Sequence, residues 1–86
     1  MEDEIGKVTH IFSKISVGVI EVTQGELRVG DRIHIKGRIS DFYQVVESMQ
    51  KEHSSVAIAK AGESIGLKVQ SPVHEHDLVF KVQAEP

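Results

Sequence analysis

The chain has 86 residues, of which 40% are hydrophobic and 27% charged, and 10 Lys and Arg against 13 Asp and Glu give a formal net charge of −3. This length predicts one domain, and this charge balance does not favour a nucleic-acid binder. The lack of Cys excludes a disulfide framework, a thiolate zinc site and a cysteine nucleophile. The acidic segment 2–4 is unlike a signal peptide, and no apolar run approaches the roughly 20 residues of a membrane span, so we expect a cytoplasmic protein.

The composition favours strands, because Ile and Val number 21 whereas Leu and Ala number 7, and β-branched side chains pack well on pleated sheets. Strands are predicted at 5–12, 16–22, 31–36, 42–50, 55–59, 64–70 and 77–82. The segment 41–52 also fits helical spacing, but its strand-rich neighbours and the turn at Gly37 favour a strand. We therefore expect one all-β domain over residues 1–86, with an ordered core at about 5–82, as a sandwich or a closed barrel.

Alternation of apolar and polar residues predicts which side chains face the core. In the segment 31–36 it places Ile33 and Ile35 inward. The same pattern in the last two predicted strands places six more side chains inward: Ile65, Leu67, Val69, Leu78, Phe80 and Val82.

A group of basic residues is the most suggestive charge pattern. Its members are Arg28, Arg32, His34, Lys36 and Arg38. Strand parity places the middle three on one outward face, with the other two in the flanking turns, and such a stripe can follow a phosphate backbone. Tyr43 and Phe42 lie near enough to stack on bases, although Phe42 fits the core equally well. The alternative is a solvated face whose cations pair weakly with carboxylates.

Two motifs resemble catalytic or nucleotide-binding signatures without their context. Residues 62–66 match the nucleophile elbow, but Ser64 opens an alternating strand, and the histidines and aspartate at 74–77 follow too soon for an α/β sheet. Residues 25–30 have the glycine spacing of a P-loop, but the next two are Asp and Arg instead of Lys and Ser or Thr. We expect no catalytic residue and no bound nucleotide.

A metal site is a further possibility at His74 and His76, because alternate residues of a strand share a face. Its third ligand would have to come from His10, His53 or Glu63. Short histidine spacings are a loose signal, and a solvated loop is favoured here. We therefore expect no metal and no cofactor.

Three blocks of the sequence carry a resemblance to a known family. Residues 17–37, which include Gly-Glu-Leu-Arg-Val-Gly-Asp-Arg-Ile, residues 46–50 and residues 61–67 match in order and spacing. They resemble the second domain of translational GTPases such as elongation factor Tu. Further segments are similar to small, free-standing translation elongation factor-like proteins: 11–15, 40–42 and 75–82. Related barrels also occur at the C-terminus of U32-type peptidases.

The resemblance implies a closed antiparallel β-barrel of six or seven strands, like domain 2 of elongation factor Tu. In that group the barrel contacts tRNA or ribosomal RNA, and the family's acidic residue near the tRNA end corresponds in position to Glu47. The segment 20–22 departs from the pattern, because Glu21 stands where the family has Arg. The GTPase domain is absent, so hydrolysis cannot be carried over.

Three functions compete on these grounds. The first is a non-catalytic, translation-factor-like module that binds RNA or a ribosome-associated partner through the basic face. The alternative is an accessory domain that docks on another protein, as in the U32-type peptidases. A hydrolase or metal enzyme that uses Ser64 ranks last. We expect no membrane partner.

Overall fold

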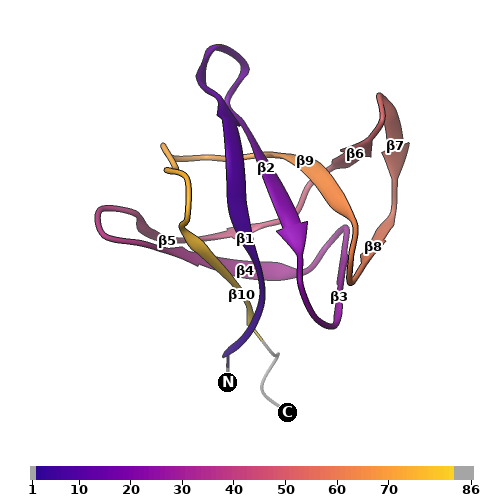
Figure 1. The fold of residues 1–86 in the computed structure, drawn as a ribbon, viewed down its shortest axis with the longest axis horizontal. Helices are drawn as coiled ribbons and strands as arrows, with labels where there is room; N and C mark the ends of the chain where they lie inside the picture. Colours follow the sequence, from indigo (N-terminus) through magenta and orange to yellow (C-terminus); the bar gives the residue numbers. More distant parts are fainter. Residues whose placement is uncertain (1, 83–86) are drawn as a thin grey trace.

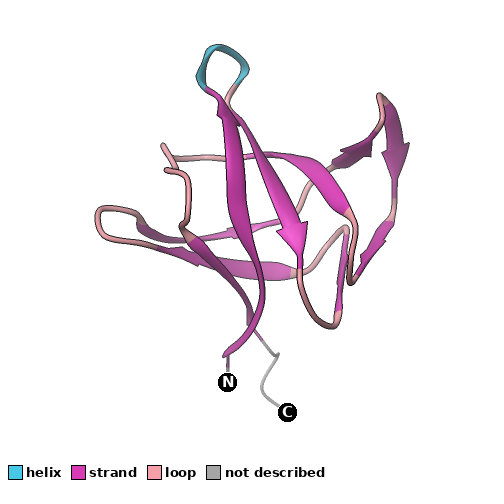
Figure 2. Ribbon diagram, in the orientation of Figure 1, coloured by secondary structure: helices cyan, strands magenta, loops and turns pink. Residues whose placement is uncertain are grey.

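The computed structural model describes residues 2–82, and almost all of its regular structure is β (Figures 1 and 2). The strands are β1 (Glu2–Phe12), β2 (Val17–Val22), β3 (Glu26–Arg28), β4 (Arg32–Lys36), β5 (Asp41–Val45), β6 (Met49–Lys51), β7 (Ser54–Val56), β8 (Ile58–Lys60), β9 (Ser64–Lys68) and β10 (Leu78–Val82). A single 3-10 turn (Ser13–Ile15) lies between β1 and β2. No helix in the described range is long and apolar enough to cross a membrane.

The strands form one curved eight-stranded sheet in the order β5-β4-β10-β1-β2-β9-β6-β7 and a two-stranded sheet of β3 and β8. Every pairing among these strands is antiparallel. The sheet curls around a common interior, as Figure 1 shows. The all-β antiparallel prediction is confirmed. The observed ladder differs from a closed one of six or seven strands, because β5 and β7 remain its edges in residues 2–82.

The core confirms the predicted faces of two strands and corrects that of the last one. Ile33 and Ile35 on β4 are fully buried, as are Ile65 and Leu67 on β9, and Val69 after β9 is buried as well. In β10, Val79 has an exposed fraction of 0%, whereas Leu78 is 37% exposed and Phe80 and Val82 are only half-buried. The prediction of Leu78, Phe80 and Val82 as inward residues was therefore wrong.

The cause of this inversion lies in the residues that flank β10. The run Leu-Val-Phe is apolar at every position, so it accepts either orientation. Asp77 faces inward, where its carboxylate accepts a hydrogen bond from the His74 amide at 2.8 Å, and Val79 then lies opposite Ile35 of β4. A polar contact at the turn thus sets the parity of the strand.

Two predicted strands are each divided, and one short strand was missed. The segment 42–50 divides at 46–48, where the Val46 amide donates to Asp31 O at 2.8 Å and Val46 O accepts from the Gly30 amide at 2.8 Å. The segment 55–59 divides into β7 and β8, and β8 pairs with the unpredicted β3. No helix forms at 41–52, in agreement with the prediction.

Candidate functional site

The three central basic residues lie on the outward face of β4, but they do not form a continuous stripe. Arg32 and Lys36 are exposed, whereas His34 between them is only 7% exposed. The Tyr43 ring covers His34 in a stacked arrangement, with ring centroids 4.1 Å apart. The Arg32 guanidinium carbon lies 5.3 Å from the centroid of the same Tyr43 ring. Tyr43 therefore stacks on a histidine of its own hairpin, and Phe42 turns inward to pack against the core.

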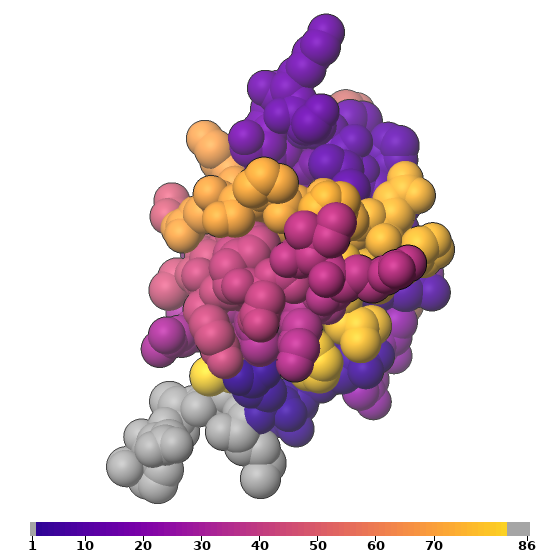
Figure 3. All heavy atoms as spheres, turned by 90° about the vertical axis from the view of Figure 1, so that its left-hand side faces the viewer, coloured from indigo at the N-terminus to yellow at the C-terminus, as the bar shows by residue number. Residues whose placement is uncertain are grey.

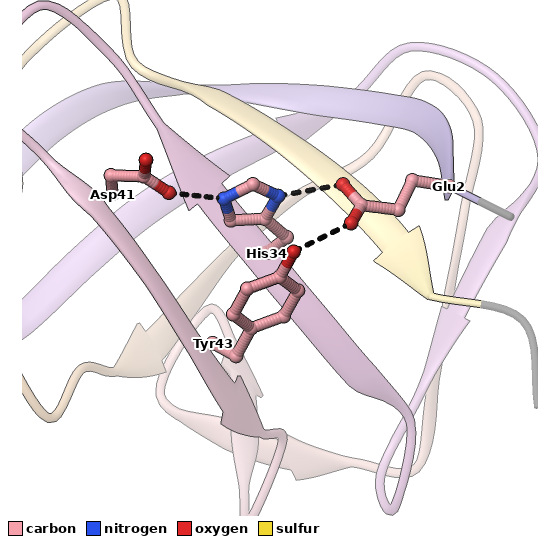
Figure 4. A network of polar contacts seen from close by, with 4 residues as sticks. All are labelled: Glu2, His34, Asp41 and Tyr43. Carbon is pink, nitrogen blue, oxygen red and sulfur yellow. Dashed lines mark hydrogen bonds and ion pairs between the residues drawn. The ribbon is translucent and has the colours of Figure 1, made fainter.

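Both ring nitrogens of His34 contact carboxylates (Figure 4). Nδ1 lies 2.6 Å from Glu2 Oε1, and Nε2 lies 2.5 Å from Asp41 Oδ1. The Tyr43 hydroxyl donates to the second oxygen of Glu2 at 2.8 Å. Because Glu2 is on β1, His34 on β4 and Asp41 on β5, the network joins three strands across β10.

The protonated form of His34 suits this network, because an imidazolium donates from both nitrogens. Burial by itself acts to lower the pKa of His34, but the hydrogen bonds with Asp41 and Glu2 outweigh it and the pKa is raised. The His34 contact lowers the pKa of Glu2, with help from the Tyr43 hydroxyl, and also lowers the pKa of Asp41. Both ring nitrogens of His34 are thus occupied by carboxylates within the fold, which leaves neither of them free to contact an external phosphate.

Four of the five remaining predicted nucleic-acid-binding residues lie in two surface grooves at opposite ends of β4. Arg32, Glu47 and Tyr43 line one groove, in which Gln70 Nε2 donates to Glu47 Oε1 at 3.4 Å. Another groove at the far end contains Lys36, Arg38, Ile39, His74, His76 and Leu78. Arg28 stands apart on β3 and pairs with Glu26 at 3.1 Å. The structure thus does not bring the whole predicted set together.

The second groove, hereafter the turn groove, runs between the β4–β5 turn at 37–40 and the turn at 74–77. Figure 3 shows these two segments on one face of the molecule. Ser40 Oγ lies 3.0 Å from His74 Nδ1, and a methyl group on Gly37 would lie only 1.8 Å from Asp77 Oδ1. The two turns are therefore in direct contact and hold the groove in a fixed shape.

The contact of Ser40, His74 and Asp77 does not have the geometry of a catalytic triad. In a triad the hydroxyl and the carboxylate contact opposite nitrogens of the imidazole. Here Ser40 Oγ and Asp77 Oδ2 both face Nδ1, at 3.0 and 3.9 Å. The Ser40 side chain is buried, and Asp77 Oδ2 accepts a hydrogen bond from the His74 amide. These contacts fasten one turn to the other.

Two arrangements that the sequence disfavoured, a serine hydrolase site and a metal site, are not assembled in residues 2–82. Ser64 opens β9 opposite Glu21, as its strand pattern predicted. No group of three or more His, Asp or Glu side chains in the described range is placed to hold a metal ion. Of the potential third ligands for His74 and His76, Glu63 instead pairs with Lys51, and His10 lies 3.9 Å from Glu75.

Glu2 and Asp41 were not predicted from the sequence as partners of His34, although the contact with Asp41 could have been predicted. In the antiparallel β4–β5 hairpin, His34 lies opposite Tyr43, and Lys36 lies opposite Asp41. Diagonal neighbours in such a pair are close enough for contact, so this register predicts the Asp41 contact. Glu2 could not be found in this way, because it reaches His34 across an intervening strand.

The motif blocks that suggested translation factors have structural roles in the turns. Gly25 and Gly30 have φ of 67° and 99°, and the Asp31 carboxylate accepts from the Arg28 amide at 2.8 Å. Gly62 has a φ of 93°, and the Glu63 carboxylate accepts from the Lys60 amide at 2.7 Å. Such residues specify tight turns of a β fold, and a fold is shared by proteins of unrelated function.

Comparison of sequences identifies relatives among proteases. An uncharacterized protease of Methanocaldococcus jannaschii is 42% identical over 78 residues, which are 90% of this chain and 19% of that protein. A collagenase of Porphyromonas gingivalis is 32% identical over 78 residues, which are 90% of this chain and 22% of the collagenase. The chain thus spans about a fifth of the length of these relatives. No family model matches it.

Comparison of structures shows the same fold in the C-terminal domain of a Geobacillus thermoleovorans protein assigned to the U32 peptidases. The TM-score is 0.86 at 20% identity, over 94% of this chain and 93% of that domain. A crystal structure of the selenomethionine variant of that domain gives a TM-score of 0.83 at 20% identity, over 90% of this chain and 96% of the other. At this identity the likeness concerns the fold.

These matches correct the function drawn from the sequence. The predicted relationship to translation factors is wrong, because the matched sequences are proteases and the matched fold is that of a U32 peptidase domain. The main hypothesis, an RNA-binding translation-factor-like module, is wrong for the same reason. The alternative, an accessory domain of a U32-type peptidase, is the one that the matches favour. The nucleic-acid role of the individual basic side chains and the cytoplasmic location stay predictions.

Proposed function

We propose that this chain is an accessory, non-catalytic β-domain that works with the catalytic region of a U32-type peptidase. One observation carries the proposal: the M. jannaschii protease matches the chain over 90% of its length, yet four-fifths of that protease lies outside the match, since the match covers 19% of it. The P. gingivalis collagenase has the same relation to the chain. A segment that accompanies a much larger protease is expected to assist binding, positioning or assembly.

The absence of an assembled active site in residues 2–82 supports a non-catalytic role. Ser64 faces solvent at the start of β9, and the buried Ser40 contacts an imidazole whose other nitrogen has no carboxylate partner among residues 2–82. Peptide hydrolysis needs an activated nucleophile together with a base and an oriented site for the developing oxyanion. In this proposal those groups belong to the remaining region of the peptidase.

We also infer that the curved sheet acts as a closed barrel, although its strand ladder ends at β5 and β7. Hydrogen bonds outside the ladder support this inference. The Val29 amide donates to Ala57 O at 3.0 Å, which links the end of β3 to the junction of β7 and β8. The Gln44 side chain on β5 donates to Lys68 O at 2.9 Å and accepts a hydrogen bond from the Gln70 amide at 2.9 Å, which links the edge strand β5 to the end of β9. Such bonds join strands that the eight-stranded ladder leaves unpaired, as closure of the sheet requires.

The proposal is tested by binding to a protease that lacks the corresponding segment. We expect this chain to form a one-to-one complex, measured by calorimetry, with M. jannaschii protease from which the 78 matched residues have been removed. The intact protease is the matched control and should not bind, because its own segment occupies the surface. Nuclease treatment should leave the complex unchanged. The proposal fails if the truncated protease does not bind, or if the isolated chain itself cleaves the protease's substrate.

A further inference from the structure

The turn groove has a volume of about 770 Å³ and lies on the surface between two turns that are fastened to each other. Its two acidic members contact groups other than its cations. Asp77 is 3% exposed and accepts the His74 amide, and Glu75 Oε2 lies 3.9 Å from His10 Nδ1. The groove is therefore preformed, and within residues 2–82 neither of its carboxylates forms an ion pair with Lys36 or Arg38.

The two cations of the groove are available to an external anion. Lys36 and Arg38 are both exposed, and neither takes part in any of the ion pairs formed within residues 2–82. Lys36 acts on Asp41 only as a neighbouring charge, because that carboxylate is hydrogen-bonded to His34. Two unpaired cations in one concavity attract a ligand with more than one negative charge.

Two exposed apolar side chains in the same groove narrow the chemistry of the ligand. Ile39 is 79% exposed at the tip of the β4–β5 turn, and Leu78 is 37% exposed at the start of β10. An anion without apolar groups would leave these side chains in water, whereas an acidic peptide with aliphatic residues would cover them.

A nucleic acid fits this lining less well than a peptide does. Single-stranded nucleic acids bind through aromatic side chains that stack on their bases. The described lining of the turn groove contains no Phe or Tyr, and Tyr43 lies in the other groove, where it stacks on His34. The groove thus combines charge for carboxylates with an aliphatic surface and offers no aromatic platform for a base.

We propose that the turn groove binds an acidic, aliphatic peptide segment of a partner polypeptide. Lys36 and Arg38 contact its carboxylates, and Ile39 and Leu78 contact its aliphatic side chains. This inference depends on the lining of the groove and holds whether or not the chain acts with a peptidase, so its test uses the chain alone.

The probe is a short fluorescein-labelled peptide in which Glu alternates with Leu, and binding to the full chain is followed by fluorescence anisotropy. Two exposed ion pairs together contribute about a tenfold change in affinity. We therefore expect the double variant Lys36→Glu, Arg38→Glu to weaken binding at least about tenfold. The matched control, Lys14→Glu with Lys68→Glu, reverses the same amount of charge outside the groove and should change the affinity less than about twofold.

A second variant separates the apolar contribution from the charge. Ile39→Ser should weaken the Glu-Leu probe and leave a probe that alternates Glu with Ser unaffected. Because Lys36, Arg38 and Ile39 are exposed, each variant should still unfold cooperatively from a folded state, although Lys36→Glu places a carboxylate opposite Asp41 and should lower its thermal midpoint by a few degrees. The proposal is overturned if the Glu-Leu probe does not bind, if the control variant loses as much affinity, or if single-stranded RNA binds through the same residues in place of the peptide.

Discussion

Gly37 has no room for a side chain, which makes the contact between the two turns measurable. A Cβ at Gly37 would lie 1.8 Å from Asp77 Oδ1 and 2.6 Å from Asp77 Cγ. Asp77 cannot move freely, because its backbone oxygen accepts a hydrogen bond from the Val8 amide at 2.8 Å and its carboxylate accepts one from the His74 amide at 2.8 Å. The substitution Gly37→Ala must therefore displace a buried, hydrogen-bonded carboxylate or separate the two turns.

The magnitude follows from these two consequences. Overpacking of a well-packed site costs about 1–3 kcal/mol, and loss of a hydrogen bond to a charged group costs about 1.5–3 kcal/mol. Gly37→Ala should thus lower the free energy of unfolding by about 2.5–6 kcal/mol, which lowers the thermal midpoint of a domain of this size by at least about 10 °C. Urea unfolding and calorimetry measure both quantities.

Two further variants test the cause. Gly66→Ala is the matched control, because its Cβ would meet nothing closer than 3.4 Å, and its free energy of unfolding should change by less than about 1 kcal/mol. In an Asp77→Ala background the steric conflict is absent, so adding Gly37→Ala should cost less than about 1 kcal/mol there. The reasoning is refuted if Gly37→Ala leaves the stability unchanged, or if it costs the same with and without the Asp77 carboxylate.

Further predictions concern the histidine network and the sheet edges. The pKa of His34 is raised above 6.5, so the stability that its protonation contributes is complete below pH 6.5 and is lost as the pH rises through the raised pKa. The pKa values of Glu2 and Asp41 are lowered from 4.5 and 3.8, so the stability that their ionised forms contribute is lost as the pH falls through the lowered values. The free energy of unfolding in urea should therefore be highest between about pH 4.5 and 6.5, and this maximum should be less pronounced in the His34→Gln variant. Identical pH profiles of the unfolding free energy for the parent chain and the variant would contradict the network. For the barrel, hydrogen exchange should show strong protection of the Val29 and Gln70 amides, whereas exchange at the rate of open loops would contradict the closure.

The sequence predicted the strands well where the pattern was unambiguous. In β4 and β9 a strict alternation defines both the strand and its buried face, and Ile33, Ile35, Ile65 and Leu67 are all fully buried. In β10 three consecutive apolar residues hide the alternation, and the sequence therefore predicted the wrong side of the strand as the buried one. There the orientation depends on Asp77, whose hydrogen-bond partner is defined only by the folded turn.

The site was less predictable because its main contacts are long-range. The parity of β4 placed Arg32, His34 and Lys36 on one face, and this much was right. Whether His34 faces solvent depends on Glu2, which is 32 positions away in sequence, and on the sheet order that brings β1 near β4. The turn motifs misled for a related reason: they encode a fold, and the function resides in surfaces that those motifs do not specify.

The most direct test of the proposed accessory role is a replacement in the P. gingivalis collagenase. Its 78 matched residues are deleted in one variant and replaced by this chain in a second. An unrelated β-domain of similar size takes their place in a third variant. The account predicts that deletion lowers kcat/KM for collagen, that this chain restores most of the loss, and that the unrelated domain does not. A deletion variant with full activity, or a replacement by this chain that performs no better than the unrelated domain, would contradict it.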